Sequence, residues 1–216
     1  MFGRKAVEPG VRMAFSCAYA AGLTGILAKL CLITMFVLLG GGLEDGTLLD
    51  SAFHAAGSAS DLLGSLSTAL TIPVAIFWGR RLPQRRTARF VQAAGFASMV
   101  LLSVGGPLLV LGVLAFEIET TIAIAALIVL NFWLLLINRW LRLSNVLPYR
   151  TARFGEFMGA GFLAGYVIVG LGLLLPWMSW PQLPVFGVGV LVGLPAYLGF
   201  PVWFVVLGRH LRASVG

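Results

Sequence analysis

Charged residues are scarce in this sequence. They make up 11% of the 216 residues, whereas a soluble domain normally carries about 25%. Hydrophobic residues reach 59%, and the mean hydropathy is +0.97. Runs such as 14–40, 90–115 and 157–178 exceed the roughly 20 apolar residues that cross ~30 Å of hydrocarbon. The composition therefore excludes a soluble globular protein and predicts an integral membrane protein.

The sequence also lacks the alternating pattern of membrane-spanning strands. Segments 122–137 and 167–175 are continuously apolar, whereas a barrel strand alternates over ~10 residues. We therefore predict an all-α membrane protein, a single transmembrane domain over 1–216 that forms a six-transmembrane-helix bundle. The predicted spans are about 14–40, 58–79, 90–114, 119–138, 156–178 and 185–208.

Residues with catalytic or metal-binding chemistry are few. Cys17 and Cys31 are ~21 Å apart along one helix, too far for a disulfide within the chain. His54 and His210 fall on opposite sides of the predicted membrane, so they cannot jointly bind a haem. The sequence contains no HExxH, GxSxG or phosphate-binding glycine loop. We predict no catalytic residue, no metal site and no cofactor.

Basic residues are missing from three of the predicted loops. Fourteen of the fifteen lysines and arginines lie at the two termini or in the loops 80–89 and 139–156. The positive-inside rule then places both termini in the cytoplasm. We expect this basic face to bind anionic lipids rather than nucleic acid. The candidate headgroup ligands are Arg80, Arg81, Arg85, Arg86, Arg89, Arg139, Arg142, Arg150, Arg153, Arg209 and Arg212.

The loop after the first predicted helix has helical character. In 47–56 the apolar residues recur at helical spacing, and Thr47 is a candidate N-cap with Asp50 three residues on. We predict a short amphipathic helix on the outer surface here. Asp50 and His54 are four residues apart, which suits either a pH-sensitive pair or a solvated histidine.

Short sequence motifs recur along the chain. Arg-Thr-Ala-Arg-Phe occurs at 86–90 and again at 150–154, and similar endings close the even-numbered spans at 79–82, 138–141 and 208–211. Three parallel helical hairpins would produce this pattern. The alternative is convergence, because helix entry favours threonine caps and inner-leaflet arginines.

One lysine interrupts the first apolar segment. Lys29 lies near mid-span, where a charge is costly unless it is paired or hydrated. Asp61 lies at a matching depth on the second helix, so we predict that the two share a polar pocket as an ion pair. The alternative is that Lys29 extends outward to water and Asp61 caps its helix.

Polar residues follow a 3-4-3 spacing on the second helix. Ser58, Asp61, Ser65 and Thr68 would line one face, which serves either a ligand pocket or helix packing. With Lys29 they are the candidate ligand-binding residues.

Small and amide residues indicate further helix contacts. The pairs 155/159, 161/165 and 189/193 are glycines in small-xxx-small spacing and predict close contacts of the last two helices. Gln92, Asn131 and Asn138 are predicted to donate interhelical hydrogen bonds. Gly105-Gly106-Pro107 is a strong interruption deep in a span, and a broken helix there would favour a transporter.

The chain resembles small six-helix bacterial integral membrane proteins of unknown function. The resemblance lies in the Gly208-Arg209-His210-Leu211 ending and the aromatic-rich residues 201–204. It implies a multi-pass protein of the bacterial inner (cytoplasmic) membrane and carries over no catalytic residue.

We expect a non-enzymatic protein that binds a small or lipid-like ligand or serves as an accessory subunit of a membrane complex, with a second copy or another membrane protein as partner. The alternative is a small oligomeric secondary transporter. An intramembrane enzyme ranks last because acid/base pairs are scarce.

Overall fold

The computed structural model describes residues 9–40, 48–82, 85–176 and 180–213. They form six helices, α1 (Pro9–Gly40), α2 (Leu48–Gly79), α3 (Arg86–Val110), α4 (Phe116–Leu143), α5 (Tyr149–Leu173) and α6 (Gln182–Ala213). All six helices are long and apolar enough to cross a membrane. The predicted all-α class and the six spans are confirmed.

The helices extend beyond the predicted spans at the end that carries the arginines. α3 begins at Arg86, and α4 continues to Leu143. Several arginines assigned to loops therefore belong to helix ends, because arginine is a good helix former whose long side chain still reaches the interface. Asn145 then reverses the chain with a φ of 54°, and the Val146 N–H donates to the Leu141 carbonyl at 2.9 Å.

The predicted surface helix at 47–56 is instead the beginning of α2. Residues are helical from Leu48 and continue without a break to Gly79, while Thr47 lies outside the described residues. No proline separates 48–56 from the span, so the backbone hydrogen bonds simply propagate. Within these turns His54 Nε2 lies 3.4 Å from Asp50 Oδ1.

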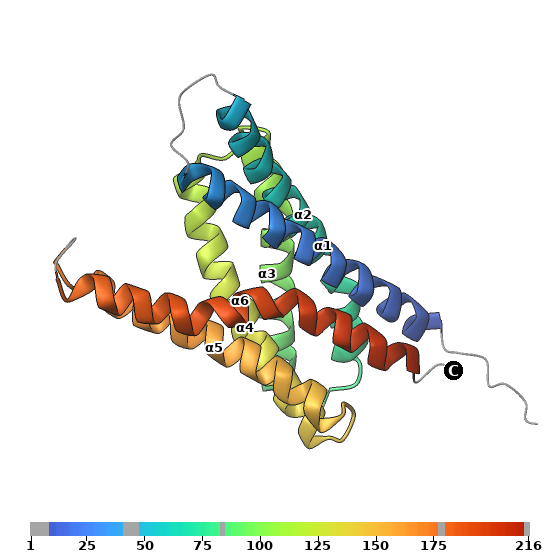
Figure 1. Ribbon diagram of the computed structural model, residues 1–216. Coiled ribbons are helices and arrows are strands. Elements are labelled where there is room, and N and C mark those ends of the chain that lie inside the picture. Colours follow the sequence, from blue (N-terminus) through green and yellow to red (C-terminus); the bar gives the residue numbers. More distant parts are fainter. Residues whose placement is uncertain (1–8, 41–47, 83–84, 177–179, 214–216) are drawn as a thin grey trace, which may run out of the picture.

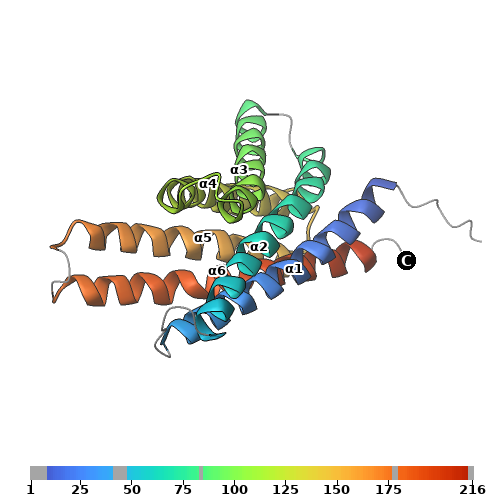
Figure 2. The same ribbon diagram turned by 90° about the horizontal axis from the view of Figure 1, so that it is seen from above.

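Each helix packs against its neighbours in the chain, and α6 packs against α1, so the six form a closed ring (Figures 1 and 2). No other helix pair is in contact within the described ranges. Short connections make neighbours antiparallel, and an even number of helices makes α6 antiparallel to α1 as well. Hence α1, α3 and α5 begin, and α2, α4 and α6 end, at one end of the ring, here called the basic end. The opposite end is the acidic end.

The three even-numbered helices bury residues at the same spacing before their similar endings. The buried residues are Thr71, Val74, Ala75 and Trp78 in α2, with Leu82 just after its end; Leu130, Trp133, Leu134, Ile137 and Leu141 in α4; and Trp203, Phe204, Leu207 and Leu211 in α6. The three hairpins therefore occupy equivalent places around the ring. Common ancestry of the hairpins stays a prediction.

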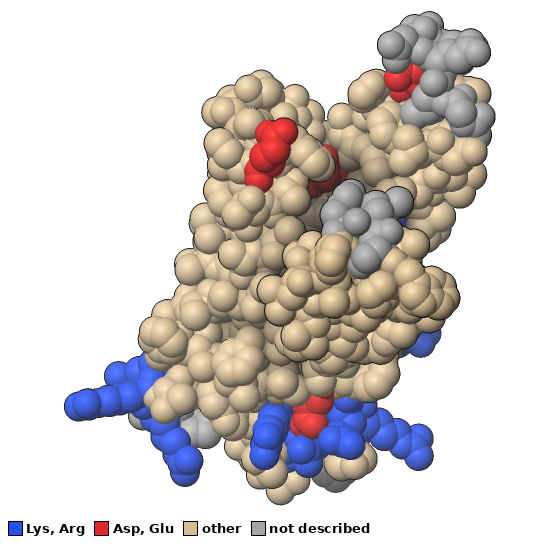
Figure 3. All heavy atoms as spheres, turned by 90° about the vertical axis from the view of Figure 1, so that its left-hand side faces the viewer, with Lys and Arg blue, Asp and Glu red and all other residues tan. Residues whose placement is uncertain are grey.

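The core is concentrated toward the basic end. Trp78, Ile137 and Leu207 fill this part of the ring and are at most 3% exposed. Toward the acidic end no residue of α1 after Ala28 is buried, and the α5–α6 hairpin diverges from the other helices (Figures 1 and 2). Figure 3 shows a hollow on this face, with acidic side chains in and above it and Lys and Arg gathered at the other end. The ring is thus closed at one end and open at the other.

Glycines allow the closest helix contacts. A Cβ on Gly165 would lie 2.6 Å from the Gly193 Cα, which confirms the predicted α5–α6 contact. The prediction is wrong for the pair at 155/159, which faces α4 instead. α3 is unbroken through Gly105-Gly106-Pro107. Gly106 serves close packing instead, because a Cβ there would lie 2.8 Å from the Asp61 carbonyl oxygen of α2.

One glutamine links three helices. The Trp133 Nε1–H donates to Gln92 Oε1 at 3.0 Å, and Gln92 Nε2 donates to the Ala75 carbonyl at 2.8 Å, which confirms the interhelical role of Gln92. Asn131 and Asn138 instead donate to carbonyls of their own helix four residues earlier, so that prediction is wrong for them. An i−4 carbonyl is always within reach on a helix, whereas a partner on another helix depends on packing.

Gln92→Leu is expected to destabilise the protein by about 1–3 kcal/mol, because it leaves the buried Trp133 N–H without an acceptor. Unfolding in mixed detergent micelles measures this change. Equal stability of wild type and Gln92→Leu would contradict the linking role.

Candidate functional site

A cavity of about 250 Å³ lies inside the ring where the helices begin to diverge, and all six helices line it. Its polar lining consists of Lys29, Ser60, Asp61, Ser65, Ser67, Thr68, Glu119, Asn131 and Tyr197. Its bulky apolar lining consists of Leu102, Leu127, Leu130, Phe162, Phe200 and Pro201. Convergent polar groups in a mostly apolar, concave site are typical of small-molecule binding.

The equivalent hairpins supply different side chains to this cavity. Counted from their common endings, Thr68 of α2, Leu127 of α4 and Tyr197 of α6 occupy the same position, and all three line it. A near-symmetric ring therefore encloses an asymmetric site, with charged and aromatic groups on particular walls.

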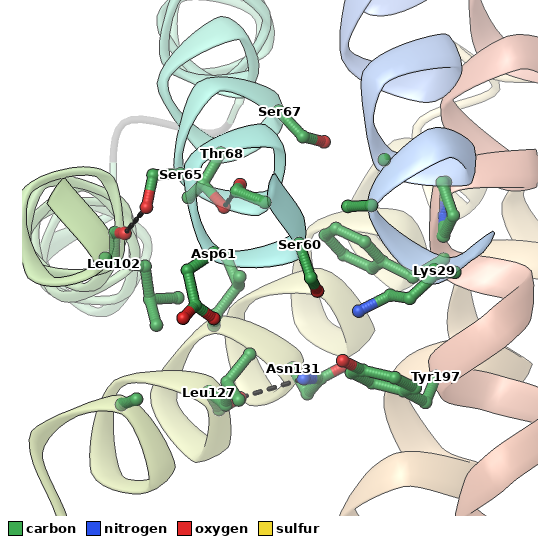
Figure 4. A pocket seen from close by; sticks show the side chains of 18 of the residues that line it. Lys29, Ser60, Asp61, Ser65, Ser67, Thr68, Leu102, Leu127, Asn131 and Tyr197 are labelled. Atoms are coloured by element: carbon green, nitrogen blue, oxygen red, sulfur yellow. Dashed lines mark hydrogen bonds between the residues drawn. The ribbon is translucent and has the colours of Figure 1, made fainter. Parts of the chain in front are cut away.

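Lys29 projects from α1 into the cavity (Figure 4). Its ammonium nitrogen lies 3.2 Å from the centroid of the Tyr197 ring, and this cation–π contact holds it on the α6 side. Within the described part of the chain, the ammonium has no hydrogen bond and no ion pair. Lys29 is thus an intramembrane cation whose donors lack a protein acceptor.

Two carboxylates line the same cavity. Asp61 comes from α2 and points into the space between α2, α3 and α4 (Figure 4). Glu119 comes from the first turn of α4, close to Gly105, where a Cβ would lie 3.3 Å from the Glu119 Oε1. Glu119 is the first residue of the predicted span 119–138, but it is absent from the candidate ligand-binding residues predicted from the sequence.

Lys29 and Asp61 share a polar cavity, as predicted, but they do not pair. Among the residues that the structure describes, no ion pair joins the two side chains. The site also extends beyond the first two helices, where it was predicted, because α4 contributes Glu119 and Asn131 and α6 contributes Tyr197.

The predicted polar face of α2 serves both packing and the cavity. Ser65 donates to the Leu102 carbonyl of α3 at 3.1 Å, and Thr68 donates to the Gly64 carbonyl of its own helix at 2.9 Å. Both also line the cavity, whereas Ser58 is half-buried and does not. Ser67, outside the predicted spacing, donates to the Ala21 carbonyl of α1 at 2.7 Å.

Three of the predicted headgroup arginines are engaged within the protein. Arg142 Nε lies 2.6 Å from Glu156 Oε1, and Arg153 Nη1 lies 3.2 Å from Glu156 Oε2. Glu156 is buried, so this cluster joins α4 to α5 at the basic end. Arg81 lies over the Phe77 ring at 3.7 Å and donates to the Phe77 carbonyl. The remaining candidates are exposed at the basic end: Arg80, Arg85, Arg86, Arg89, Arg139, Arg150, Arg209 and Arg212.

The described residues contain no group of three or more His, Cys, Asp or Glu that could hold a metal ion. Cys17 and Cys31 are free thiols. No family model matches the chain, and comparisons with curated proteins and with solved structures found no match either. The structure therefore defines the chain as a six-helix protein with six candidate membrane spans and a central cavity lined by charged residues.

Proposed function

We propose that this is a non-enzymatic integral membrane protein that binds a small polar ligand in the central cavity, entering from the acidic end. The observation that carries the proposal is Lys29, an intramembrane ammonium that has no acceptor among the described residues and points into a cavity lined by every helix. A charge at this depth lowers stability, and such residues are retained where a ligand or a pathway requires them.

The size of the cavity limits the ligand. A volume of about 250 Å³ corresponds to roughly eight water molecules at ~30 Å³ each. A compact molecule, or the headgroup of a larger one, fits this space. Phe162 and Phe200 line it beside the charged groups, so the ligand can be partly apolar.

The open and closed ends of the ring favour transport as a second candidate function. The cavity opens at the acidic end, while Trp78, Ile137 and Leu207 block the way to the basic end. An alternating-access transporter has this arrangement in one of its two states. Uptake of the identified ligand into proteoliposomes would separate a transporter from a protein that only binds.

Filling the cavity is expected to abolish ligand binding. Gly64 lines the cavity, and a Cβ there meets nothing within 4 Å, so Gly64→Leu adds its side chain to empty space. Native purification followed by mass spectrometry should find a small molecule on the wild type and at least tenfold less on Gly64→Leu. The matched control is Gly187→Leu, an exposed α6 position with open space that is outside the cavity.

Equal retention by wild type and Gly64→Leu would contradict a ligand in this cavity. Copurification of a stoichiometric protein partner without any small molecule would favour the accessory-subunit function instead.

We also propose that the basic end binds anionic lipid. A groove of about 510 Å³ between α2 and α3 is lined by Arg80 and Arg89 together with apolar Ile76, Leu82 and Phe96. This combination suits a phosphate headgroup on the arginines and an acyl chain on the apolar wall.

A further inference from the structure

Three charged groups in the cavity lack protein partners. Neither Asp61 nor Glu119 has a side-chain hydrogen bond or an ion pair within the described ranges, and Lys29 has only the Tyr197 ring. Three unpaired charges in one intramembrane cavity are costly unless something else in the cavity pairs with them.

A ligand of one charge cannot satisfy all three groups. A simple cation would pair with Asp61 or Glu119 and leave Lys29 without an acceptor, and a simple anion would do the reverse. Lys29 also lies beyond ion-pair distance of both carboxylates, so the groups do not neutralise each other. A molecule that carries both charges and extends between the two sides satisfies them together.

We propose that the ligand is a small zwitterion, with a carboxylate or phosphate that accepts from the Lys29 ammonium and a primary ammonium that donates to Asp61 and Glu119. This inference rests on the proposed function, since it names the ligand of the same cavity. Charge-assisted hydrogen bonds of this kind are the strongest that side chains form.

The cationic end of the ligand needs N–H donors. The carboxylates of Asp61 and Glu119 accept hydrogen bonds, which a trimethylated ammonium cannot donate. Quaternary ammonium groups are instead recognised by aromatic faces. The aromatic lining residues Phe162, Tyr197 and Phe200 come from α5 and α6, on the side that Lys29 occupies, whereas the cationic end of the ligand faces the two carboxylates. The site therefore favours an ethanolamine-type or amino-acid-type ammonium over a choline-type one.

This chemistry has two sources, a free amino-acid-like solute or the headgroup of an ethanolamine phospholipid. The first experiment uses the full-length protein in phosphatidylcholine nanodiscs and measures binding by titration calorimetry. The probes are phosphoethanolamine, glycine and β-alanine as zwitterions, ethanolamine and inorganic phosphate as single charges, and phosphocholine as the trimethylated analogue.

Variants assign each end of the ligand. Lys29→Gln should weaken the best zwitterion by about ten- to a hundredfold and leave ethanolamine unchanged. Glu119→Gln should weaken the zwitterion and ethanolamine but leave phosphate unchanged. Glu117→Gln is the matched control, because Glu117 lies exposed on the same helix outside the cavity and should change none of them.

The second experiment tests the lipid source by native mass spectrometry after reconstitution with phosphatidylethanolamine or phosphatidylcholine. If the wild type retains one phosphatidylethanolamine and Lys29→Gln loses it, the inference is supported and the ligand is a lipid headgroup. If a free zwitterion binds in the first experiment, the inference is supported and the ligand is a soluble molecule.

Equal affinity for a zwitterion and for ethanolamine or phosphate alone would overturn the inference and leave the binding function intact. Absence of binding by every zwitterionic probe and lipid would overturn it as well. Retention of a small molecule by the wild type but not by Gly64→Leu tests the proposed function separately, whatever the chemistry of that molecule.

Discussion

Gly165→Leu is expected to destabilise the protein by about 3 kcal/mol or more, at the upper end of overpacking effects. At Gly165 a Cβ would lie 2.6 Å from the Gly193 Cα and 2.9 Å from the Gly189 carbonyl oxygen. These obstacles are backbone atoms of α6, which no rotamer change can move. The α5–α6 hairpin, which forms one wall of the open end, should separate.

Gly170→Leu is the control for Gly165→Leu, because a Cβ on Gly170 meets nothing within 4 Å although it lies on the same helix. Unfolding of both variants in mixed micelles measures the difference. If the two leucines are tolerated equally, α5 and α6 do not pack at their glycines as described.

Lys29→Met is expected to stabilise the ligand-free protein by about 1–2 kcal/mol while abolishing ligand retention. An unpaired charge at mid-membrane costs roughly 3 kcal/mol, and the Tyr197 cation–π contact returns ~1–2 kcal/mol of that. Methionine has a similar length and no charge, so it removes the cost without opening a void. A gain in stability with a loss of binding is characteristic of a residue kept for function.

Arg12→Met controls for loss of a positive charge, because Arg12 is exposed at the basic end and should change stability by less than about 0.5 kcal/mol. Since no ion pair joins Lys29 to Asp61, the effects of Lys29→Met and Asp61→Asn should add in the double variant. Strong destabilisation by Lys29→Met, rescued by Asp61→Asn, would show that the two side chains pair.

The sequence predicted the helices and their alternating direction. A long apolar run is what a helix needs to cross hydrocarbon, and arginines gather in the loops on one side of the membrane. The sequence also predicted that Lys29 and Asp61 share a cavity, since helix rise alone fixes depth in the membrane. The rotation of each helix about its axis, and the choice of which helices pack together, do not follow from helix rise. That Lys29 meets Tyr197 rather than Asp61 depends on α6 closing the ring against α1, and no periodicity along the chain encodes that contact.

Local hydrogen bonds and a shifted helix boundary explain the remaining differences from the sequence predictions. Asn131 and Asn138 looked like interhelical donors because amides are rare in spans, yet each amide finds a carbonyl of its own helix. Glu119 was not predicted as a cavity residue, because it lies at the boundary of the predicted span 119–138. α4 begins earlier, at Phe116, and this brings the Glu119 side chain to the cavity wall.

Access of water to Gly64 from one side tests the central claim most directly. Cysteine is placed at Gly64 after both native cysteines are replaced, and vesicles of each orientation receive a charged, membrane-impermeant maleimide. Leu66→Cys is the control, because Leu66 is exposed on α2 at similar depth but lies outside the cavity. The cavity described here predicts labelling at position 64 from the side of the acidic end alone, and none at 66. Absence of labelling at 64, or labelling only from the side of the basic end, would contradict a hydrated cavity open at the acidic end.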